Sequence, residues 1–288
     1  MTVTEFPGGV RVEGAEPFDL AQTLDCGQCF RFAPTGDGGW FGAAGGHAAG
    51  LRFEGESLVL EGATAAEFES FWRDYLDLDR DYAAVRAAFA RDPRLAPCVA
   101  FAPGIRVLRQ PAFEALIAFI VSQNNNVPRI KGILARLCAL FGEPLPGGAR
   151  AFPAPERLAA CSEAELAPLR SGWRAGYILD AARQVAAGTV DLQAVAVMPL
   201  ADARRELTRI RGVGPKVAEC VLLYGMGRLE CFPMDVWMKR AMARLFPEET
   251  GKMPESAPAI FGPYAGIAQQ YIFHYCRCHP EEIREKTA

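Results

Sequence analysis

The pattern of hydrophobic and polar positions in this 288-residue chain has one period in the first 62 or so residues and a different period in the rest. Residues 1 to about 62 hold short stretches in which apolar and polar residues alternate, such as LRFEG and SLVLEG, with glycines between them. Alternation with a period of two is typical of strands that have one buried face. The pattern predicts an antiparallel sheet in this part of the chain.

From Thr64 onward apolar residues recur every three or four positions, which is typical of amphipathic helices. Thr64 is expected to cap the first helix, and the prolines at 93, 97 and 103 mark a boundary. Ser162 with Glu165 three residues later predicts a capping box. Residues 143–156, rich in proline and glycine, are expected to form a loop. The helical segments are predicted at 64–78, 80–92, 111–123, 127–142, 162–172, 173–188, 207–225, after 235, and at 262–277.

The stretch Leu207 to Gly225, LTRIRGVGPKVAECVLLYG, predicts two helices joined by a tight turn. Gly212 and Gly214, with Val213 between them, let the backbone turn sharply and approach a phosphate closely. Pro215 suits the first helical position, where no amide donor is needed. The open amides at that helix start can bind an anion. The motif therefore predicts a helix–hairpin–helix that contacts nucleic-acid phosphates.

Lys216, at the start of the second of these helices, is one of five lysines among 31 basic residues, so arginine is the usual cation of this chain. Arginine never loses its proton in proteins, whereas lysine can, and a neutral amine is a nucleophile that forms Schiff bases. Asp235 follows nineteen residues later, at the start of another helical run. A lysine and a carboxylate beside a phosphate site predict covalent chemistry on a nucleic acid. The alternative is that Lys216 only contacts a phosphate.

Composition and charge limit the class of protein. Half of the residues are hydrophobic and 23% are charged, as in ordinary globular proteins. No apolar run is long enough to span a bilayer, and the N-terminus MTVTEFPGGV lacks the basic start and apolar core of a signal peptide, so a cytoplasmic location is expected. The net charge of −3 weighs against nucleic-acid binding, but residues 201–246 hold nine basic and five acidic residues. The basic excess therefore surrounds the hairpin, where phosphate binding needs it.

Nine cysteines are present, and in a chain of this size without a secretion signal they are expected to be reduced thiols. Cys276, Cys278 and His279 hint at a metal site, but their spacing fits neither a zinc finger nor a four-cysteine iron–sulfur run. The three histidines are too scattered for a zinc hydrolase. We therefore expect no metal and no other cofactor.

Polar and aromatic residues at predicted helix ends are candidates for contact with bases. Asn124, Arg129 and Arg174 can hydrogen-bond base edges, and Trp173 can wedge between stacked bases. Each also fits a structural role, as a helix cap, a surface charge or a half-buried packing residue. Core packing is the first expectation for two residues on apolar helix faces, Cys220 and Phe273.

LTRIRGVGPKVAEC followed by PMDV resembles the helix–hairpin–helix DNA glycosylases. Four further segments resemble the 8-oxoguanine DNA glycosylase/lyase branch of that family, and together they cover roughly Leu24 to Arg277. The chain lacks the four-cysteine iron–sulfur ligation of the endonuclease III and adenine glycosylase branches. The four segments are GQCFRF, IVSQNNNVPRIKGILARLCALFG, SGWRAGYILDAARQV and GPYAGIAQQYIF.

The resemblance implies an α+β fold, with an N-terminal antiparallel β-sheet domain packed on two mainly α-helical domains and an active-site cleft between the helical ones. We expect the β-rich domain with flanking helices to span residues 1–105. The helical glycosylase region would span 106–288, with the hairpin at about 201–225.

The resemblance also implies roles for single residues in a reaction on an 8-oxoguanine nucleotide that is flipped out of the duplex. Lys216 would attack C1′ of the deoxyribose, hold the sugar as a Schiff base and nick the strand by β-elimination. Asp235 would stabilise positive charge on the sugar. Four residues would bind the damaged base: Cys220 and Phe273 on its faces, Gln269 at its Watson–Crick edge, and Gly27, whose carbonyl accepts the N7–H that guanine lacks.

The other strand and the backbone are assigned in the same way. Cytosine opposite the lesion would be read by Asn124, Arg129 and Arg174, with Trp173 as the wedge in place of the family's tyrosine. The hairpin residues Gly212, Val213 and Gly214 would contact DNA phosphates. The chain departs from animal members at Trp237, which replaces a phosphate-contacting histidine.

The expected partner is thus double-stranded DNA containing 8-oxoguanine, bound by a monomer, with no membrane involved. Two alternatives stay open. One is an alkylated-base DNA glycosylase without lyase activity, although such enzymes typically lack the hairpin lysine. The other is a non-catalytic helix–hairpin–helix module that only holds DNA.

Overall fold

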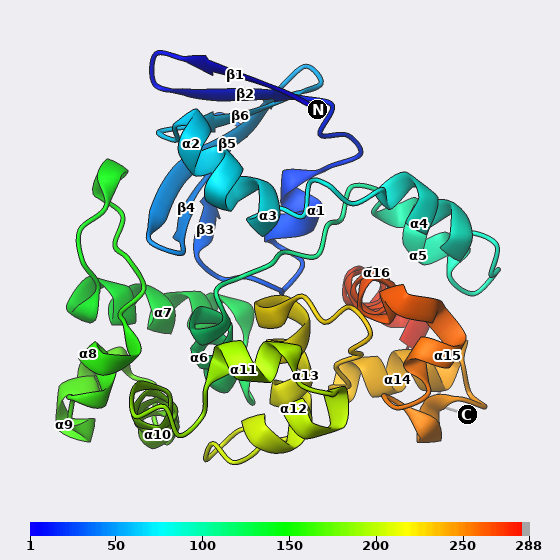
Figure 1. Ribbon diagram of the computed structural model, residues 1–288. Coiled ribbons are helices and arrows are strands. Elements are labelled where there is room, and N and C mark those ends of the chain that lie inside the picture. Colours follow the sequence, from blue (N-terminus) through cyan, green and yellow to red (C-terminus); the bar gives the residue numbers. More distant parts are fainter. Residues whose placement is uncertain (284–288) are drawn as a thin grey trace.

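The computed structural model describes residues 1–283. Six strands form one antiparallel sheet in the order β1-β2-β6-β5-β4-β3, which confirms the sheet predicted from the alternating pattern. Figure 1 shows this sheet on one side of the molecule and most of the helices on the other. The strands are β1 Thr2–Phe6, β2 Gly9–Glu13, β3 Phe32–Pro34, β4 Trp40–Ala44, β5 His47–Glu54 and β6 Ser57–Glu61.

The sheet has its own apolar core, in which Leu51 of β5 and Leu60 of β6 face each other across the ladder. Helix α2 (Ala65–Glu67), a π-helix (Phe68–Trp72) and α3 (Arg73–Tyr75) continue one another and pack Phe68 and Trp72 into this core. Thr64 caps this run, as predicted from the sequence, and Glu67 completes a capping box with it.

Several short helices occur where the sequence pattern gave none, and for two of them the local cause is clear. Leu20–Leu24 forms α1 inside the region predicted as strands, because Asp19 caps it by accepting a hydrogen bond from the amide three residues on. Ala96–Phe101 forms α5 inside the proline-marked boundary, since Pro97 occupies the first turn, where its missing N–H does no harm. A side-chain cap thus favours α1, and a proline in the first turn favours α5.

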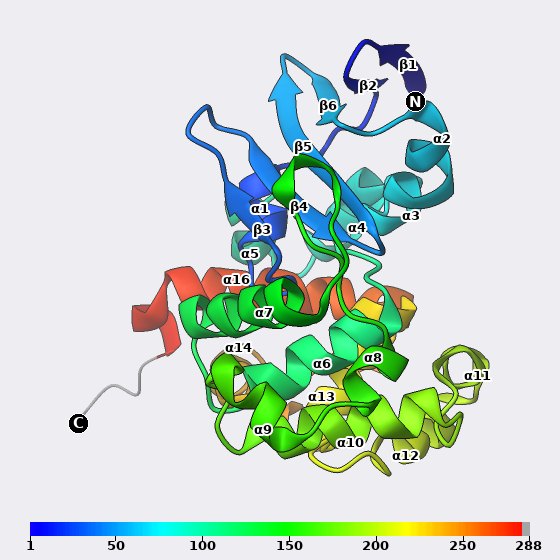
Figure 2. The ribbon, with the colours of Figure 1, turned by 90° about the vertical axis from the view of Figure 1, so that its left-hand side faces the viewer.

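The helices from α4 to α16 share one continuous apolar core. Helix α6 crosses its centre and is buried from Ala115 to Val121. In Figure 2, α7 and α16 lie directly below the sheet, and α10 and α12 lie at the far side of the helical part. The longer helices are α4 Tyr82–Phe89, α6 Ala112–Ser122, α7 Val127–Phe141, α10 Arg174–Ala186, α12 Leu200–Leu207, α14 Val236–Leu245 and α16 Ala265–Cys278. The shorter ones are α8 Pro155–Ala159, which begins in the predicted loop, α9 Glu163–Leu166, α11 Leu192–Val197, α13 Pro215–Cys220 and α15 Ala257–Phe261.

The predicted division of the chain at residue 105 stays a prediction, and residues 284–288 of its second part lie outside the described residues. Among residues 1–283, none of the helices combines the length and the apolar character that a membrane crossing requires.

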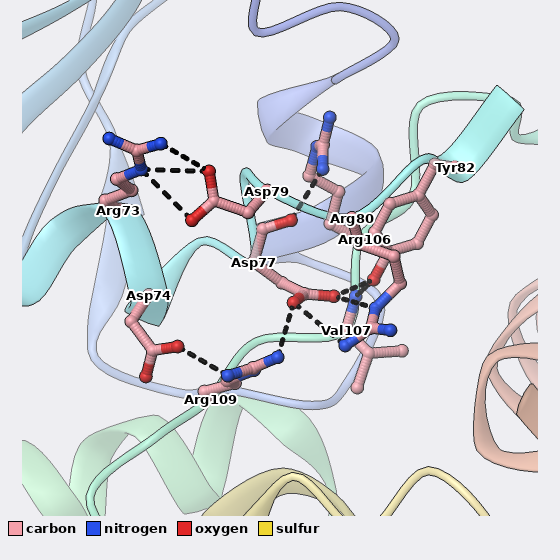
Figure 3. Close-up of polar contacts among 9 residues, drawn as sticks. All are labelled: Arg73, Asp74, Asp77, Asp79, Arg80, Tyr82, Arg106, Val107 and Arg109. Atoms are coloured by element: carbon pink, nitrogen blue, oxygen red, sulfur yellow. Dashed lines mark hydrogen bonds and ion pairs between the residues drawn. The ribbon is translucent and has the colours of Figure 1, made fainter. Parts of the chain in front are cut away.

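A buried polar cluster ties the sheet region to the helices, as Figure 3 shows. The carboxylate of Asp77 accepts hydrogen bonds from Arg80 Nε at 2.6 Å and from the Tyr82 hydroxyl at 2.9 Å. Arg106 is 2% exposed and donates to the backbone carbonyls of Asp77 and Ala15, at 2.7 and 2.8 Å. Its guanidinium also lies 4.7 Å from the centre of the Tyr82 ring. Arg106 therefore joins three segments that are distant in the sequence.

Replacing Arg106 by leucine is expected to lower the free energy of unfolding by about 3 kcal/mol, because two buried carbonyls lose charged donors. Urea denaturation of the purified protein measures this. The matched control is Arg205→Leu, since the Arg205 side chain is 74% exposed and pairs with Asp202 at the surface; its effect should stay within about 0.5 kcal/mol. Equal losses in the two variants would contradict the structural role given to Arg106.

Candidate active site

The predicted hairpin is present, but its first helix, α12, already ends at Leu207, where the stretch Leu207 to Gly225 was expected to begin it, and residues 208–214 form the turn to α13. Gly212 has φ +86°, and a Cβ at this position would lie 2.2 Å from the Tyr177 ring, so only glycine fits. Pro215 is the first residue of α13, and Gly214 offers no side-chain cap to its first amides. Gln123 Nε2 donates to the Gly212 carbonyl at 3.0 Å and fixes the turn against the end of α6.

An open groove of about 440 Å³ runs along this turn. It is lined by Gln123, Trp173, Tyr177 and residues 208–214. Trp173 is 51% exposed and its ring centre lies 5.2 Å from that of Tyr177. The groove therefore combines exposed aromatic surface with the backbone of the hairpin.

The side chain of Lys216 points into a second, smaller pocket. Its Nζ lies 3.5 Å from the Ser122 hydroxyl oxygen and 5.2 Å from the centre of the Phe119 ring. The pocket measures about 40 Å³ and draws its walls from four separate parts of the chain. It is lined by Gly27, Phe119, Lys216, Cys220, Tyr224, Pro233, Asp235, Gln269 and Phe273.

Asp235 is the N-cap of α14, and its Oδ1 accepts a hydrogen bond from the amide of Met238 at 2.8 Å. Cap geometry is the local reason for its position, because aspartate is among the preferred N-cap residues. The cap places the carboxylate in the wall of the same pocket as Lys216. The lysine and the carboxylate that the sequence set nineteen residues apart thus face one cavity.

Cys220 and Phe273 line this pocket too. Burial raises the pKa of the Cys220 thiol to about 11, and the nearby Lys216 ammonium only partly opposes this. Cys220 therefore stays an uncharged thiol near neutral pH, with the surface character of a small apolar group. Phe273 is half-buried and rests on Gly27, where a Cβ would lie 3.3 Å from its Cε1 atom.

Gly27 has φ +90° and sits in a loop that a neighbouring glutamine holds. Gln28 is fully buried and donates from Nε2 to the carbonyls of Thr23 and Arg106, at 2.9 and 2.7 Å. Its Oε1 accepts from the Leu108 amide at 2.8 Å. Sequence reasoning missed Gln28, although it lies within the quoted GQCFRF segment. The available signal was the position of Gln28 between Cys26 and Cys29, since cysteines are often buried.

The four residues predicted to contact the opposite base and the gap lie near one another, beside the hairpin groove. Asn124 (φ +46°) and Arg129 are exposed, as is Trp173. Arg174 differs, since it is buried and its guanidinium donates to the carbonyls of Gln123, Asn124 and Ser171. In this structure Arg174 therefore holds the turn that presents Asn124, and base reading by Arg174 stays a prediction.

The remaining candidates lie apart from the pocket. Trp237 is 41% exposed in the first turn of α14. Cys276 is buried, Cys278 is exposed, and His279 Nδ1 lies 3.0 Å from the Tyr275 carbonyl oxygen. Within residues 1–283, nowhere do three or more histidine, cysteine, aspartate or glutamate side chains gather in a way that could hold a metal ion.

Comparison with known proteins places this geometry in a family. Residues 11–116 match the model of the 8-oxoguanine DNA glycosylase N-terminal domain, and residues 117–262 match that of the HhH-GPD superfamily base excision DNA repair proteins. The chain is 31% identical over 277 residues to the N-glycosylase/DNA lyase OGG1 of Arabidopsis thaliana, covering 88% of this chain and 76% of the relative.

Two solved structures agree over nearly the whole fold. The Clostridium acetobutylicum 8-oxoguanine glycosylase/lyase, in complex with double-stranded DNA containing cytosine opposite to 8-oxoG, is 34% identical with a TM-score of 0.93. MBOgg1, in complex with a low affinity DNA ligand, is 38% identical with the same TM-score of 0.93. Each alignment covers 97% of this chain and 99% of the other. The two family models, the Arabidopsis relative and these structures together show that the chain belongs to the 8-oxoguanine DNA glycosylase/lyase family of the HhH-GPD superfamily.

Proposed function

We propose that this N-glycosylase/DNA lyase removes 8-oxoguanine from duplex DNA with Lys216 as its nucleophile and Asp235 as its electrostatic partner. One observation supports this most strongly. Lys216 and Asp235 line a single pocket together with Gly27, Gln269 and other residues brought from distant parts of the chain. The hairpin beside the pocket offers a surface for the DNA backbone.

In the proposed reaction the neutral amine of Lys216 attacks C1′, and the bond from C1′ to the base breaks. The base leaves with the electron pair of that bond and takes up a proton. The attached nitrogen gives up two protons, one to the departing base and one to O4′ as the C1′–O4′ bond breaks, and the opened sugar is left as a Schiff base. Removal of a C2′ proton then expels the 3′-phosphate by β-elimination. Asp235 would stabilise the positive charge that develops on the sugar as the base departs.

Base recognition would use the other walls of the pocket. The carbonyl of Gly27 would accept the N7–H of 8-oxoguanine; guanine has a bare acceptor there, so two acceptors would face each other. Cys220 and Phe273 would contact the two faces of the base, and Gln269 its Watson–Crick edge. A single water needs roughly 10–15 Å³ of cavity volume, so a pocket of about 40 Å³ holds a few waters and no purine. The pocket therefore has to widen when the base enters, and Phe273, which rests on Gly27, is the side chain that we expect to move.

Contacts with the rest of the duplex would come from the hairpin groove. Gly212, Val213 and Gly214 would meet phosphates through their amides, and Trp173 would fill the gap left by the flipped nucleotide. Cytosine opposite the lesion would be read by Asn124 and its arginine neighbours, Arg129 and Arg174. One protein molecule carries all of these groups, so we propose that a monomer acts on the DNA.

Release of 8-oxoguanine is expected to be fastest when cytosine stands opposite the lesion. Matched duplexes with each of the four bases opposite 8-oxoguanine test this under single-turnover conditions. A mispair at this position should slow release by roughly tenfold or more, since a lost base contact costs about 1–3 kcal/mol. A duplex containing 3-methyladenine serves as the control for the alkylated-base alternative. Faster release of 3-methyladenine than of 8-oxoguanine would overturn the proposed substrate.

A further inference from the structure

Three buried polar side chains meet at the wall of the pocket that contains Lys216, and two of them, Tyr224 and Gln269, line it. Gln269 and Gln270 are neighbours on α16, and Tyr224 lies in the π-helix Val221–Gly225 that continues α13. The Tyr224 hydroxyl lies 2.6 Å from Gln270 Oε1 and 3.2 Å from Gln269 Oε1. Such a cluster is costly in an apolar core unless its hydrogen bonds are satisfied, so its partners indicate what it does.

Backbone carbonyls fix the orientation of both amides. Gln270 Nε2 donates to the Cys26 carbonyl at 3.2 Å, and Gln269 Nε2 donates to the Pro233 carbonyl at 3.4 Å. A carbonyl oxygen only accepts, so each NH₂ group has to face its carbonyl. Both amide oxygens must then face Tyr224. Turning either amide over would bring two acceptors together.

Tyr224 has a single proton to share between these two oxygens. Burial raises the pKa of Tyr224 well above its ordinary value, so the hydroxyl keeps that proton. The shorter contact shows that the Tyr224 hydroxyl donates mainly to Gln270 Oε1. The Gln269 oxygen is left with the longer and weaker contact, and it keeps accepting capacity for a group that enters the pocket.

The same contacts link both sides of the base pocket. The Cys26 carbonyl belongs to the peptide bond that joins Cys26 to Gly27, so Gln270 holds the Gly27 loop from behind. Pro233 is two residues before Asp235. Tyr224 itself is fixed, because its ring stacks on Phe119 at 5.3 Å and its carbonyl accepts from the Gln110 amide at 2.7 Å.

We propose that Tyr224 and Gln270 are positioning residues. They hold the Gly27 carbonyl and the Gln269 amide at fixed positions relative to each other, and thereby let the pocket select 8-oxoguanine over guanine. The proposal rests on the proposed roles of Gly27 and Gln269. The π-helix has a part in it, because a π-helical turn shifts the side chains that follow and is frequent at functional sites.

Tyr224→Phe tests the proposal, because it removes one hydroxyl and keeps the ring. Two rates are measured under single-turnover conditions: release of 8-oxoguanine from a duplex, and nicking of a duplex with a preformed abasic site, which has no base to recognise. We expect roughly a tenfold fall in release, the size of a lost buried hydrogen bond with stranded acceptors, and unchanged nicking. Gln270→Met should show the same pattern, and the double variant should lose little more than either single one.

The matched control is Tyr271→Phe, which removes the same hydroxyl group from a tyrosine on α16, the helix that carries Gln269 and Gln270. Tyr271 is fully buried, and its hydroxyl has no hydrogen-bond partner within the described residues. Its loss should leave both rates unchanged.

Unchanged 8-oxoguanine release in Tyr224→Phe would overturn the proposal. A parallel fall of both rates would also overturn it, since that is the result expected of a residue needed only for packing. Failure of the proposed function looks different. In that case the wild-type protein itself would not nick the abasic duplex.

Discussion

Replacement of Lys216 by glutamine is expected to abolish the covalent protein–DNA adduct that borohydride traps, and to slow 8-oxoguanine release by about a thousandfold or more. An amide cannot attack C1′ or form a Schiff base. Lys216 carries the only amine among the pocket-lining residues in the described part of the chain. The adduct is measured on a denaturing gel with a duplex carrying 8-oxoguanine opposite cytosine, and release is measured on the same duplex.

Two further variants distinguish the role of Lys216 as a nucleophile from its role as a positive charge. Lys216→Arg keeps a cation beside the phosphates, yet arginine stays protonated, so DNA binding should persist without an adduct. Lys252→Gln removes a lysine whose side chain is 69% exposed and lies outside the pocket, and trapping should be unaffected. An adduct that survives in Lys216→Gln would place the nucleophile elsewhere. The Cys220 thiol is a poor substitute, because burial raises its pKa to about 11.

The hairpin and the helix caps could be predicted because short sequence patterns determine them. The turn at Gly212 needs glycine for steric reasons, the cap at Thr64 needs only a suitable residue at a helix start, and the capping box at Ser162 needs only residues three positions apart. Asp235 was likewise expected at a helix start, and it is the N-cap of α14. The helix starts that hold Lys216 and Asp235 could therefore be predicted from residues close to them in the sequence.

The buried polar residues could not be predicted, because their partners are remote in the sequence. Gln28 bonds to the carbonyl of Arg106, 78 residues away, and Gln270 to that of Cys26, 244 residues away. Hydrophobic periodicity assigned the segment of Tyr224 to a plain helix, whereas the structure forms a π-helix there. Packing between distant segments decides such details, and no local pattern reports it.

Phe273 and Cys220 are apolar residues whose place in the pocket could not be predicted from the sequence pattern either. Their apolar helix faces favoured core packing, and only the family resemblance set them apart. Both line the pocket, Cys220 fully buried and Phe273 partly exposed. An apolar residue in a pocket wall and one in a core have the same sequence pattern, since both avoid water.

Replacement of Asp235 by asparagine is expected to slow 8-oxoguanine release by about a hundredfold while leaving the fold as stable as before. Asparagine caps helices as well as aspartate does, so the hydrogen bond to the Met238 amide should persist. Only the negative charge is lost. The release rate under single-turnover conditions and the thermal midpoint of unfolding are the two measurements.

Asp191→Asn is the matched control for this change. Asp191 caps α11 by accepting from the amides of Gln193 and Ala194, and it lies outside the pocket. The same loss of charge there should alter neither rate nor midpoint. Asp235→Leu adds the loss of the cap and should also lower stability, by about 1 kcal/mol. If Asp235→Asn releases the base at the wild-type rate and only Asp235→Leu is slow, Asp235 acts as a helix cap alone, and the charge on the sugar must be stabilised by another group.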